Sequence, residues 1–492
     1  MQREQRTENR EQKIRVPVHL RAQRGVTTLL VIAFMGIFLL VVSVLTSYAF
    51  QEARYGRALY GREQALAIAE GGLEYYRWFL GHDPGDLTNG TGLPGPYTYV
   101  VNDPEGGTIG SALITVVGNQ QCGVTQSIDI TSKGTADLNP GFPRTLFARY
   151  MQKSVAWYSY LLNSKVHAGS DRIITGPYFS NGGIRMDGTN LSDVLSAVST
   201  WVCNSSYGCS PTQNNAPGVV GNGSGSALWR YPAASIDFNV IAANLTNLKT
   251  YAQSNGGLYF APAPGAAIER GYHLVFQSAG TVDVYRVSAT TVVWGYPDGA
   301  HEAEEYNIIA AQTFLGTYTI PSSCSLIFVD DRAWIEGTVK GKVTVVAATP
   351  DTSTTPDAIL SGNINYDSYD GSNGITVIAE ANILIPLNSP EIMTLHGIYV
   401  AQNGYYGRNH YTTTGQYKVP SPYDSFVIQT QLTTVGSIVS SGRTGTRWTS
   451  GGVVSSGYQT RIDSYDELQA TNPPPFTPAA STDYRFVLWK EQ

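Results

Sequence analysis

Acidic residues form the part of this sequence that most resembles a catalytic centre. Asp330, Asp331 and Glu336 lie within seven residues of one another, in the stretch VDDRAWIE. Paired carboxylates supply the acid, base or nucleophile of glycoside hydrolysis. Carboxylates in such a strand-turn segment are much more often solvated than catalytic. The sequence therefore predicts no catalytic residue, and we expect a protein that is not an enzyme.

Motifs that bind metals or phosphates are incomplete. HEAEE at 301–305 lacks the second histidine of HExxH, so we expect His301 and its three glutamates to lie in a solvated loop. GTVKGKV at 337–343 is one residue short of a phosphate-binding loop and has no Ser or Thr to bind magnesium. We predict no cofactor-binding residue, no metal ligand and no cofactor.

Tyrosines are a stronger lead to a binding site. The segment 396–424 holds six of them, interspersed with arginine, histidine and lysine. Tyrosine rings stack on sugars and on nucleobases. Candidate ligand contacts are Tyr399, Tyr405, Tyr406 and Tyr411. The competing interpretation is that tyrosine is simply common in β-rich secreted proteins.

The four cysteines are few and widely spaced. Cys203 and Cys209 have five residues between them, and outside the cytoplasm we expect them to close a small disulfide loop. Two free thiols are the alternative. Cys122 and Cys324 lie in different predicted domains, so we expect both to stay unpaired. None of these spacings suits a zinc site.

The elements that position these residues are predicted to be mainly strands. After about residue 159 the chain consists of short apolar alternations ending in turns rich in Gly, Asn or Asp, such as GITVIAEANILIP at 374–386. We predict that residues 159–450 form a right-handed β-helix (solenoid), whose turns stack and bury small β-branched side chains. No fixed repeat length is evident.

Three segments depart from this pattern. Residues 195–230 form a Ser/Gly/Asn-rich inserted loop, and 234–256 has the apolar spacing of an α-helix lying on the stack. Residues 451–492 form a C-terminal tail with a proline run, Pro473 to Pro475. We expect its last strand to cover an open end of the stack, because exposed strand edges pair with other chains.

The N-terminus predicts one long helix. Residues 1–25 carry seven Lys or Arg against three Glu, and no further charge occurs until Glu52. Such an apolar run can cross a bilayer, with the basic end on the cytoplasmic side. A cleavable signal peptide is the alternative, but 26–82 continues as a helix pattern without a break. Its second half is amphipathic, with apolar residues at Tyr55, Leu59, Leu66, Ala69, Leu73, Tyr76 and Leu80.

This N-terminus resembles the class III signal of type IV pilins and pseudopilins. The resemblance implies that a prepilin peptidase cuts after Gly25 and that Val26 becomes the N-methylated terminus. Major pilins carry glutamate at the fifth position after the cut, where this chain has Leu30. PilX-type minor pilins and tip-initiating pseudopilins commonly lack that glutamate. The resemblance further implies that 83–158 is a small pilin-like head, a β-meander packed on the amphipathic half of the helix.

Partners and location follow from the same resemblance. It implies a single-pass inner-membrane protein before assembly, with its C-terminal domain outside the cytoplasm, and a pilus subunit at the cell surface afterwards. Expected partners are other pilins, inner-membrane pilus assembly proteins, the prepilin peptidase and membrane lipid, with an extracellular surface, a glycan or DNA as the displayed ligand. The formal net charge is −6, so no global basic field favours nucleic acid.

Two function classes remain open. The favoured one is a non-enzymatic minor pilin at or near the tip, displaying a β-helix for assembly priming, adhesion or capture of DNA or a surface. The alternative is a membrane-anchored β-helix enzyme acting on polysaccharide. A surface map separates the two, because a catalytic cleft gathers two or more carboxylates.

Overall fold

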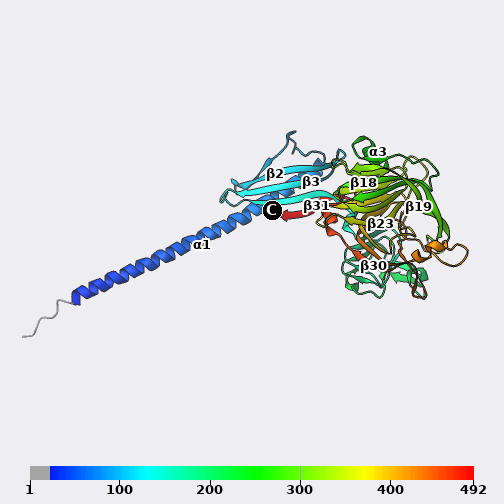
Figure 1. The fold of residues 1–492 in the computed structure, drawn as a ribbon. Helices are drawn as coiled ribbons and strands as arrows, with labels where there is room; N and C mark the ends of the chain where they lie inside the picture. Colours follow the sequence, from blue (N-terminus) through cyan, green and yellow to red (C-terminus); the bar gives the residue numbers. More distant parts are fainter. Residues whose placement is uncertain (1–22, 298, 300) are drawn as a thin grey trace, which may run out of the picture.

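The computed structural model describes residues 23–297, 299 and 301–492. The basic leader expected at 1–25 therefore lies almost entirely outside the described residues. Helix α1 (Gln23–His82) projects as a single rod from the β-rich remainder of the chain (Figure 1). The chain is mainly β, with one long N-terminal apolar helix.

The part of the chain after α1 is an antiparallel sheet, here called the head. Its strand order is β1-β2-β3-β4-β31, and the first four strands follow one another as a meander. The bounds are β1 (Tyr97–Asn102), β2 (Thr108–Gln121), β3 (Val124–Ala136), β4 (Arg144–Ser154) and β31 (Ala479–Glu491).

The second half of α1 packs on this head sheet. Leu73 and Tyr76 of the helix are buried in one cluster with Ile114 and Ile130 of the strands. The two elements approach very closely, because a Cβ on Gly134 of β3 would lie 2.1 Å from the carbonyl oxygen of Ala65. Glycine at this position lets the two backbones touch, which fixes the second half of the helix to the head.

The larger β-rich part, here called the stack, is built on a ladder of parallel strands. Its order is β15-β11-β8-β5-β28-β26-β24-β22-β20-β16, so the first strand to enter, β5, lies next to the late strand β28. The bounds are β5 (Tyr160–Leu162), β8 (Tyr178–Ser180), β11 (Val194–Ser196), β15 (Trp229–Arg230), β16 (Leu258–Phe260), β20 (Leu326–Val329), β22 (Lys342–Ala347), β24 (Gly374–Ala379), β26 (Ile392–Ala401) and β28 (Ile428–Ser440). The chain enters this ladder in the middle, runs to one end, crosses to the other end and returns.

A second parallel ladder runs beside the first. Its strands are β17 (Gly271–Gln277), β21 (Ala333–Val339), β23 (Ala358–Tyr366), β25 (Ile383–Leu384) and β27 (Tyr406–Gly407). The long antiparallel hairpin β18 (Thr281–Gly295) and β19 (Ala303–Thr319) extends it from β17. Shorter pairings complete the stack. The parallel ones join β9 (Ile184–Met186) to β6 (Val166–Ala168) and β14 (Val219–Val220), and β7 (Ile173–Ile174) to β10 (Thr189–Asn190). The antiparallel ones join β12 (Thr200–Cys203) to β13 (Gln213–Pro217), and β29 (Arg447–Ser450) to β30 (Val453–Ser464), which also pairs in parallel with β28.

Strands of the first ladder are buried on both faces, as parallel strands usually are. Ile327 and Val345 belong to the interior cluster, whereas Phe328 and Val346 face outward and are also buried. The outward face is covered in part by α3 (Leu245–Ser254), whose Leu245 and Leu248 lie in the same cluster.

The helix predicted at 234–256 is divided into two. Asp237 caps the short α2 (Phe238–Ile241), and the Asn244 side chain accepts a hydrogen bond from the backbone N–H of Asn247 at the start of α3. Each cap begins a new helix, so the chain turns between them. The inserted loop predicted at 195–230 likewise contains short strands. One of them, β15, joins the first ladder, and another, β14, pairs in parallel with β9.

The C-terminal tail departs from the prediction that its last strand covers an end of the stack. β31 pairs antiparallel with β4 as the fifth strand of the head sheet, where Figure 1 shows it in red. The preceding segment from α4 (Glu467–Thr471) leads from the stack back to the head. The edge that this strand covers is therefore that of β4, so the C-terminal strand ends in the head, beside the segment that follows α1.

Candidate functional site

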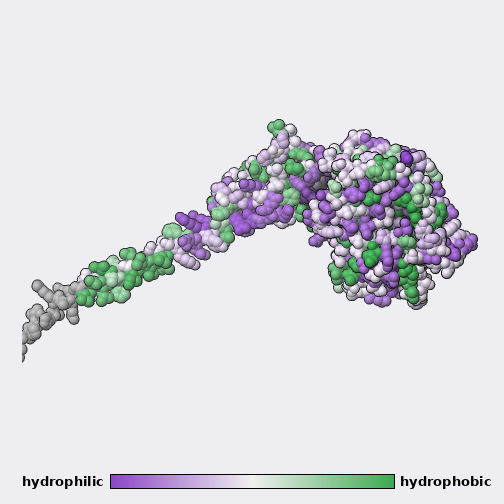
Figure 2. All heavy atoms as spheres, in the orientation of Figure 1, coloured by the Kyte–Doolittle hydropathy of each residue, from purple (hydrophilic) through white to green (hydrophobic). Residues whose placement is uncertain are grey.

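The first candidate site is the free half of α1, here called the anchor segment (Val26–Phe50). Its apolar side chains are exposed along its whole length, for example Val26 at 62% and Leu30 at 49%. Figure 2 shows this stretch as a continuous hydrophobic rod beyond the head. The helix is long and apolar enough to cross a membrane by length and composition. The predicted processing residues Gly25 and Val26 lie at its free end, within α1.

Asp330, Asp331 and Glu336, the possible catalytic cluster, do not direct their carboxylates towards a common site. Asp330 accepts hydrogen bonds from the Lys249 ammonium of α3 and from the Tyr259 hydroxyl, the latter at 2.8 Å. Asp331 instead accepts from Arg270 Nε at 3.0 Å. Both residues lie in the bend between β20 and β21, and their carboxylates bind different partners.

Glu336 is held separately, with its Oε1 3.3 Å from His273 Nε2. That contact with His273 lowers the pKa of Glu336 against the opposing effect of burial. All three carboxylates thus have structural partners.

Glu305 contradicts the prediction of a solvated loop at 301–305. It is only 6% exposed, because 303–305 belong to β19 and its side chain points inward. Its Oε1 accepts from Asn409 Nδ2 at 2.5 Å and its Oε2 from the Tyr411 hydroxyl at 2.7 Å. Burial raises the pKa of Glu305, although these hydrogen bonds act in the opposite direction.

Three of the four candidate ligand-contact tyrosines are buried, so that interpretation is wrong for them. Tyr399 and Tyr406 point into the interior of the stack and are 0% and 2% exposed, and Tyr411 is 1% exposed beneath the hairpin. Strand alternation directs the rings of Tyr399 and Tyr406 inward, and a sequence of mixed apolar and polar residues does not reveal which face is inside. Tyr405 is half-buried, and its hydroxyl donates to Asn409 Oδ1 at 2.6 Å.

Both cysteine pairs are disulfide-bonded. The predicted Cys203–Cys209 bond is present and closes the β12–β13 hairpin. The prediction that Cys122 and Cys324 stay unpaired is wrong, because they form the second disulfide. Cys122 lies in the β2–β3 turn of the head and Cys324 just before β20, so this bond joins the head to the stack.

The same junction is reinforced by hydrogen bonds. Gln121 Nε2 donates to the carbonyl oxygen of Ser322 at 3.0 Å, and Asn255 Nδ2 donates to that of Cys122 at 2.6 Å. The head and the stack are thus connected by a covalent bond, by these contacts and by the returning C-terminal chain.

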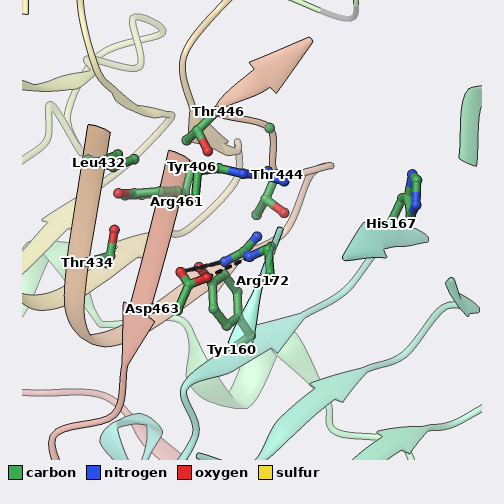
Figure 3. A pocket seen from close by; sticks show the side chains of 11 residues that line it. Tyr160, His167, Arg172, Tyr406, Leu432, Thr434, Thr444, Thr446, Arg461 and Asp463 are labelled. Carbon is green, nitrogen blue, oxygen red and sulfur yellow. Dashed lines mark hydrogen bonds and ion pairs between the residues drawn. The ribbon is translucent and has the colours of Figure 1, made fainter. Parts of the chain in front are cut away.

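An ion-pair network lies where the early strand β5 meets the late strands (Figure 3). The Arg172 guanidinium binds the Asp463 carboxylate through Nε and Nη2, both at 2.6 Å. The Tyr160 hydroxyl donates to the same carboxylate at 2.6 Å. Arg172 and Asp463 are almost completely buried, and the adjoining cavity of ≈ 20 Å³ is little larger than one water molecule. This network holds the two halves of the stack together and leaves no space for a substrate.

A larger groove, here called the hairpin groove, lies beside the start of β19 and has a volume of ≈ 490 Å³. Its floor includes Arg332, Asp357, Asn382 and Tyr405, each directly before a strand of the second ladder. Residues 303–307 and the loop 349–356 line it as well. The remaining lining residues are Ala267, Ile268, Arg270, Pro297, Asp331, Leu384 and Asn409. Of the four floor residues, only Tyr405 was a candidate from the sequence. The regular spacing of the four along the chain, 25, 25 and 23 residues, is the signal that could have revealed the other three.

Metal-binding chemistry has no counterpart in the described part of the chain. Within residues 23–297, 299 and 301–492, no group of three or more His, Cys, Asp or Glu side chains could hold a metal ion.

Comparisons with known proteins add little to this picture. No protein-family model matches the chain, and no curated protein matches it either. Among solved structures, the chain is similar to the competence-associated pilin ComZ from Thermus thermophilus. The identity is 12% and the TM-score 0.28, with 88% of this chain and 97% of that chain covered. We base no inference on a likeness of this degree.

Proposed function

We propose that the protein is a non-enzymatic minor pilin of the PilX type, anchored in the inner membrane and later part of a type IV pilus or pseudopilus. The observation that carries the proposal is the division of α1 into two halves. The anchor segment is apolar and exposed on all sides, while the second half packs on an antiparallel head sheet. A helix that is apolar all round needs lipid or neighbouring apolar helices to cover it.

Its partners are then membrane lipid before assembly and the helices of other pilins, with the assembly machinery, afterwards. A prepilin peptidase cuts between Gly25 and Val26, and Val26 is methylated. The new terminus lies at the free end of the exposed rod, where a peptidase at the cytoplasmic face has access to it.

We infer further that the stack is a right-handed β-helix that the anchor displays outside the cytoplasm. The two long ladders of parallel strands support this inference, as does the register in which successive strands of the second ladder pair. Two disulfides suit an oxidising compartment.

The enzymatic alternative has one observation in its favour, since the hairpin groove is lined by several carboxylates. Both oxygens of Glu305 and both oxygens of Asp331 already accept hydrogen bonds from the protein. Glycoside hydrolysis needs two carboxyl groups that can reach the substrate. This arrangement favours binding over hydrolysis.

The proposal is tested at the N-terminus. Intact-mass analysis of protein purified from a native membrane should give a chain that begins at Val26 with one added methyl group. Gly25→Leu should keep the leader, because the residue before the cut is no longer glycine. The matched control is Gly36→Leu, where an added Cβ has no atom within 4 Å and processing should be normal. A wild-type chain that begins near residue 50 would identify an ordinary signal peptide and refute the pilin proposal.

A further inference from the structure

The floor of the hairpin groove is a ladder of equivalent positions on successive turns of the stack. Ala333 pairs with Ala358, Ala358 with Ile383, and Ile383 with Tyr406. The residues directly before these four are Arg332, Asp357, Asn382 and Tyr405, and all four line the groove. Paired strands are about 4.8 Å apart, so the ladder extends over roughly 14 Å. The groove therefore follows the stacking direction and offers one side chain per turn.

Hydrogen bonds fix the position of this ladder. Asp357 Oδ1 accepts from the backbone N–H and from Nδ2 of Asn382, at 3.0 and 2.9 Å. Asn382 Oδ1 accepts from the backbone N–H of Tyr405 at 3.0 Å, and the Tyr405 hydroxyl donates to Asn409. Asp357, Asn382 and Tyr405 are therefore held in position before any ligand arrives, which reduces the entropy cost of binding.

One acceptor in the ladder is left for a ligand. Within the described residues, Asp357 Oδ1 accepts two hydrogen bonds and Asp357 Oδ2 accepts none. Hydroxyl-bearing residues of the loop 349–356, Ser353 and Thr355 among them, also line the groove.

The charge of the groove selects against anions. Its lining contains four carboxylates, Glu304, Glu305, Asp331 and Asp357, against the two guanidinium groups of Arg270 and Arg332. A phosphate backbone or a uronate chain would be repelled by this excess of negative charge. The lining also includes tyrosine rings and aliphatic groups, which pack against the apolar faces of sugar rings.

We propose that the hairpin groove binds a neutral oligosaccharide lying along the stack. Sugar hydroxyls both donate and accept, so they can donate to Asp357 and accept from the loop hydroxyls. A linear glycan repeats its rings at a spacing close to the separation of the turns. This proposal names the class of ligand that the displayed domain would bind. It rests on the proposed function in one respect, which is that the groove must face the outside of the cell.

The test is direct binding to the full chain in detergent. Isothermal titration with maltohexaose, cellohexaose and chitohexaose should show binding of at least one of the three, whereas hexagalacturonate and a single-stranded oligodeoxynucleotide should not bind. Asp357→Asn should weaken the bound oligosaccharide about tenfold, because a charged acceptor becomes neutral while the bonds from Asn382 can be kept. Ser353→Trp should abolish binding by filling the groove from an exposed loop residue.

Matched controls lie outside the groove. Asp367→Asn changes an exposed carboxylate that pairs with Lys340, and Ser226→Trp adds a ring to an exposed short helix. Both should bind the oligosaccharide like the wild type. The proposal is overturned if none of the three neutral oligosaccharides binds, if hexagalacturonate binds as tightly, or if Ser353→Trp leaves the affinity unchanged. Cleavage of a bound oligosaccharide would support the groove but refute the non-enzymatic function, and the N-terminal mass of the same preparation tests the pilin proposal separately.

Discussion

Single residues stabilise the stack through partly buried ion pairs, and Asp171 is the clearest example. Its Oδ1 and Oδ2 accept from Arg461 at 2.7 and 2.9 Å, and Arg447 lies 3.0 Å from Oδ2. Burial alone would raise the pKa of Asp171, but these arginines outweigh it and lower the pKa to about 2. Because the folded-state pKa lies below the ordinary value of about 3.9, the pairing stabilises the fold above pH 4 and is lost as the pH falls towards 2.

The lowered pKa of Asp171 gives a prediction for the stability of Asp171→Asn. At pH 7 the variant should be less stable than the wild type by about 1–2 kcal/mol, after allowance for solvent screening of a partly exposed pair. The difference should shrink as the pH falls through 4 towards 2. Urea unfolding followed by circular dichroism at pH 7 and pH 2.5 measures both values. Asp367→Asn removes an exposed carboxylate and should change the stability little. A loss for Asp171→Asn that is equal at the two pH values would contradict the assignment.

At the scale of elements, the two disulfides stabilise different parts of the structure. Cys203 and Cys209 are six residues apart and close a local hairpin, whereas Cys122 and Cys324 are 202 residues apart and join the head to the stack. The loop-entropy relation gives upper values of about 2 and about 5 kcal/mol for loops of these lengths.

We therefore expect Cys122→Ser with Cys324→Ser to destabilise the chain more than Cys203→Ser with Cys209→Ser. The first double variant should also loosen the head against the stack, so that limited proteolysis cuts near the junction. The second is the matched control and should keep the wild-type pattern of fragments there. Equal proteolysis of the two double variants would mean that the hydrogen bonds and β31 hold the junction without the disulfide.

At the scale of the whole molecule, the bulk of the stack and the anchor segment both bear on the place that the chain would take in the proposed filament. Figure 1 shows the stack at the far end of the head from the anchor segment, and it is much wider than the helix. Such a mass on every subunit would crowd a shaft of closely packed helices. Leu30 also removes the acidic residue that, in major pilins, pairs with a neighbour's terminal amine.

We predict a few copies per pilus, at or near its tip, with the stack facing outward. A peptide tag inserted after the exposed Gly415 allows gold labelling of intact filaments, and label should be confined to filament ends. Leu30→Glu restores the acidic residue and is the informative comparison, because any label that it adds along the shaft measures the effect of that residue. Continuous decoration by the wild-type protein would contradict a terminal position.

Local sequence alone determined the apolar helix, the strand-rich character of the rest and the short-range disulfide between Cys203 and Cys209. These features depend on neighbours within a few turns, so composition and spacing are sufficient to predict them. The apolar stripe of α1 was predicted for the same reason and is buried at Ala69, Leu73, Tyr76 and Leu80. Its first two predicted members, Tyr55 and Leu59, are exposed because the head does not cover them.

Only the tertiary structure decided which distant segments meet. The Cys122–Cys324 bond needs the head docked at β20, and β31 joins β4 because the chain returns to the head; both depend on contacts across hundreds of residues. The burial of Tyr399 and Tyr406 could not be predicted from the sequence for another reason. Strands of the parallel ladders are covered on both faces, so alternation no longer distinguishes a solvent face from a core face. The ladder from Arg332 to Tyr405 exists only because the register of successive strands brings four separated residues into one groove.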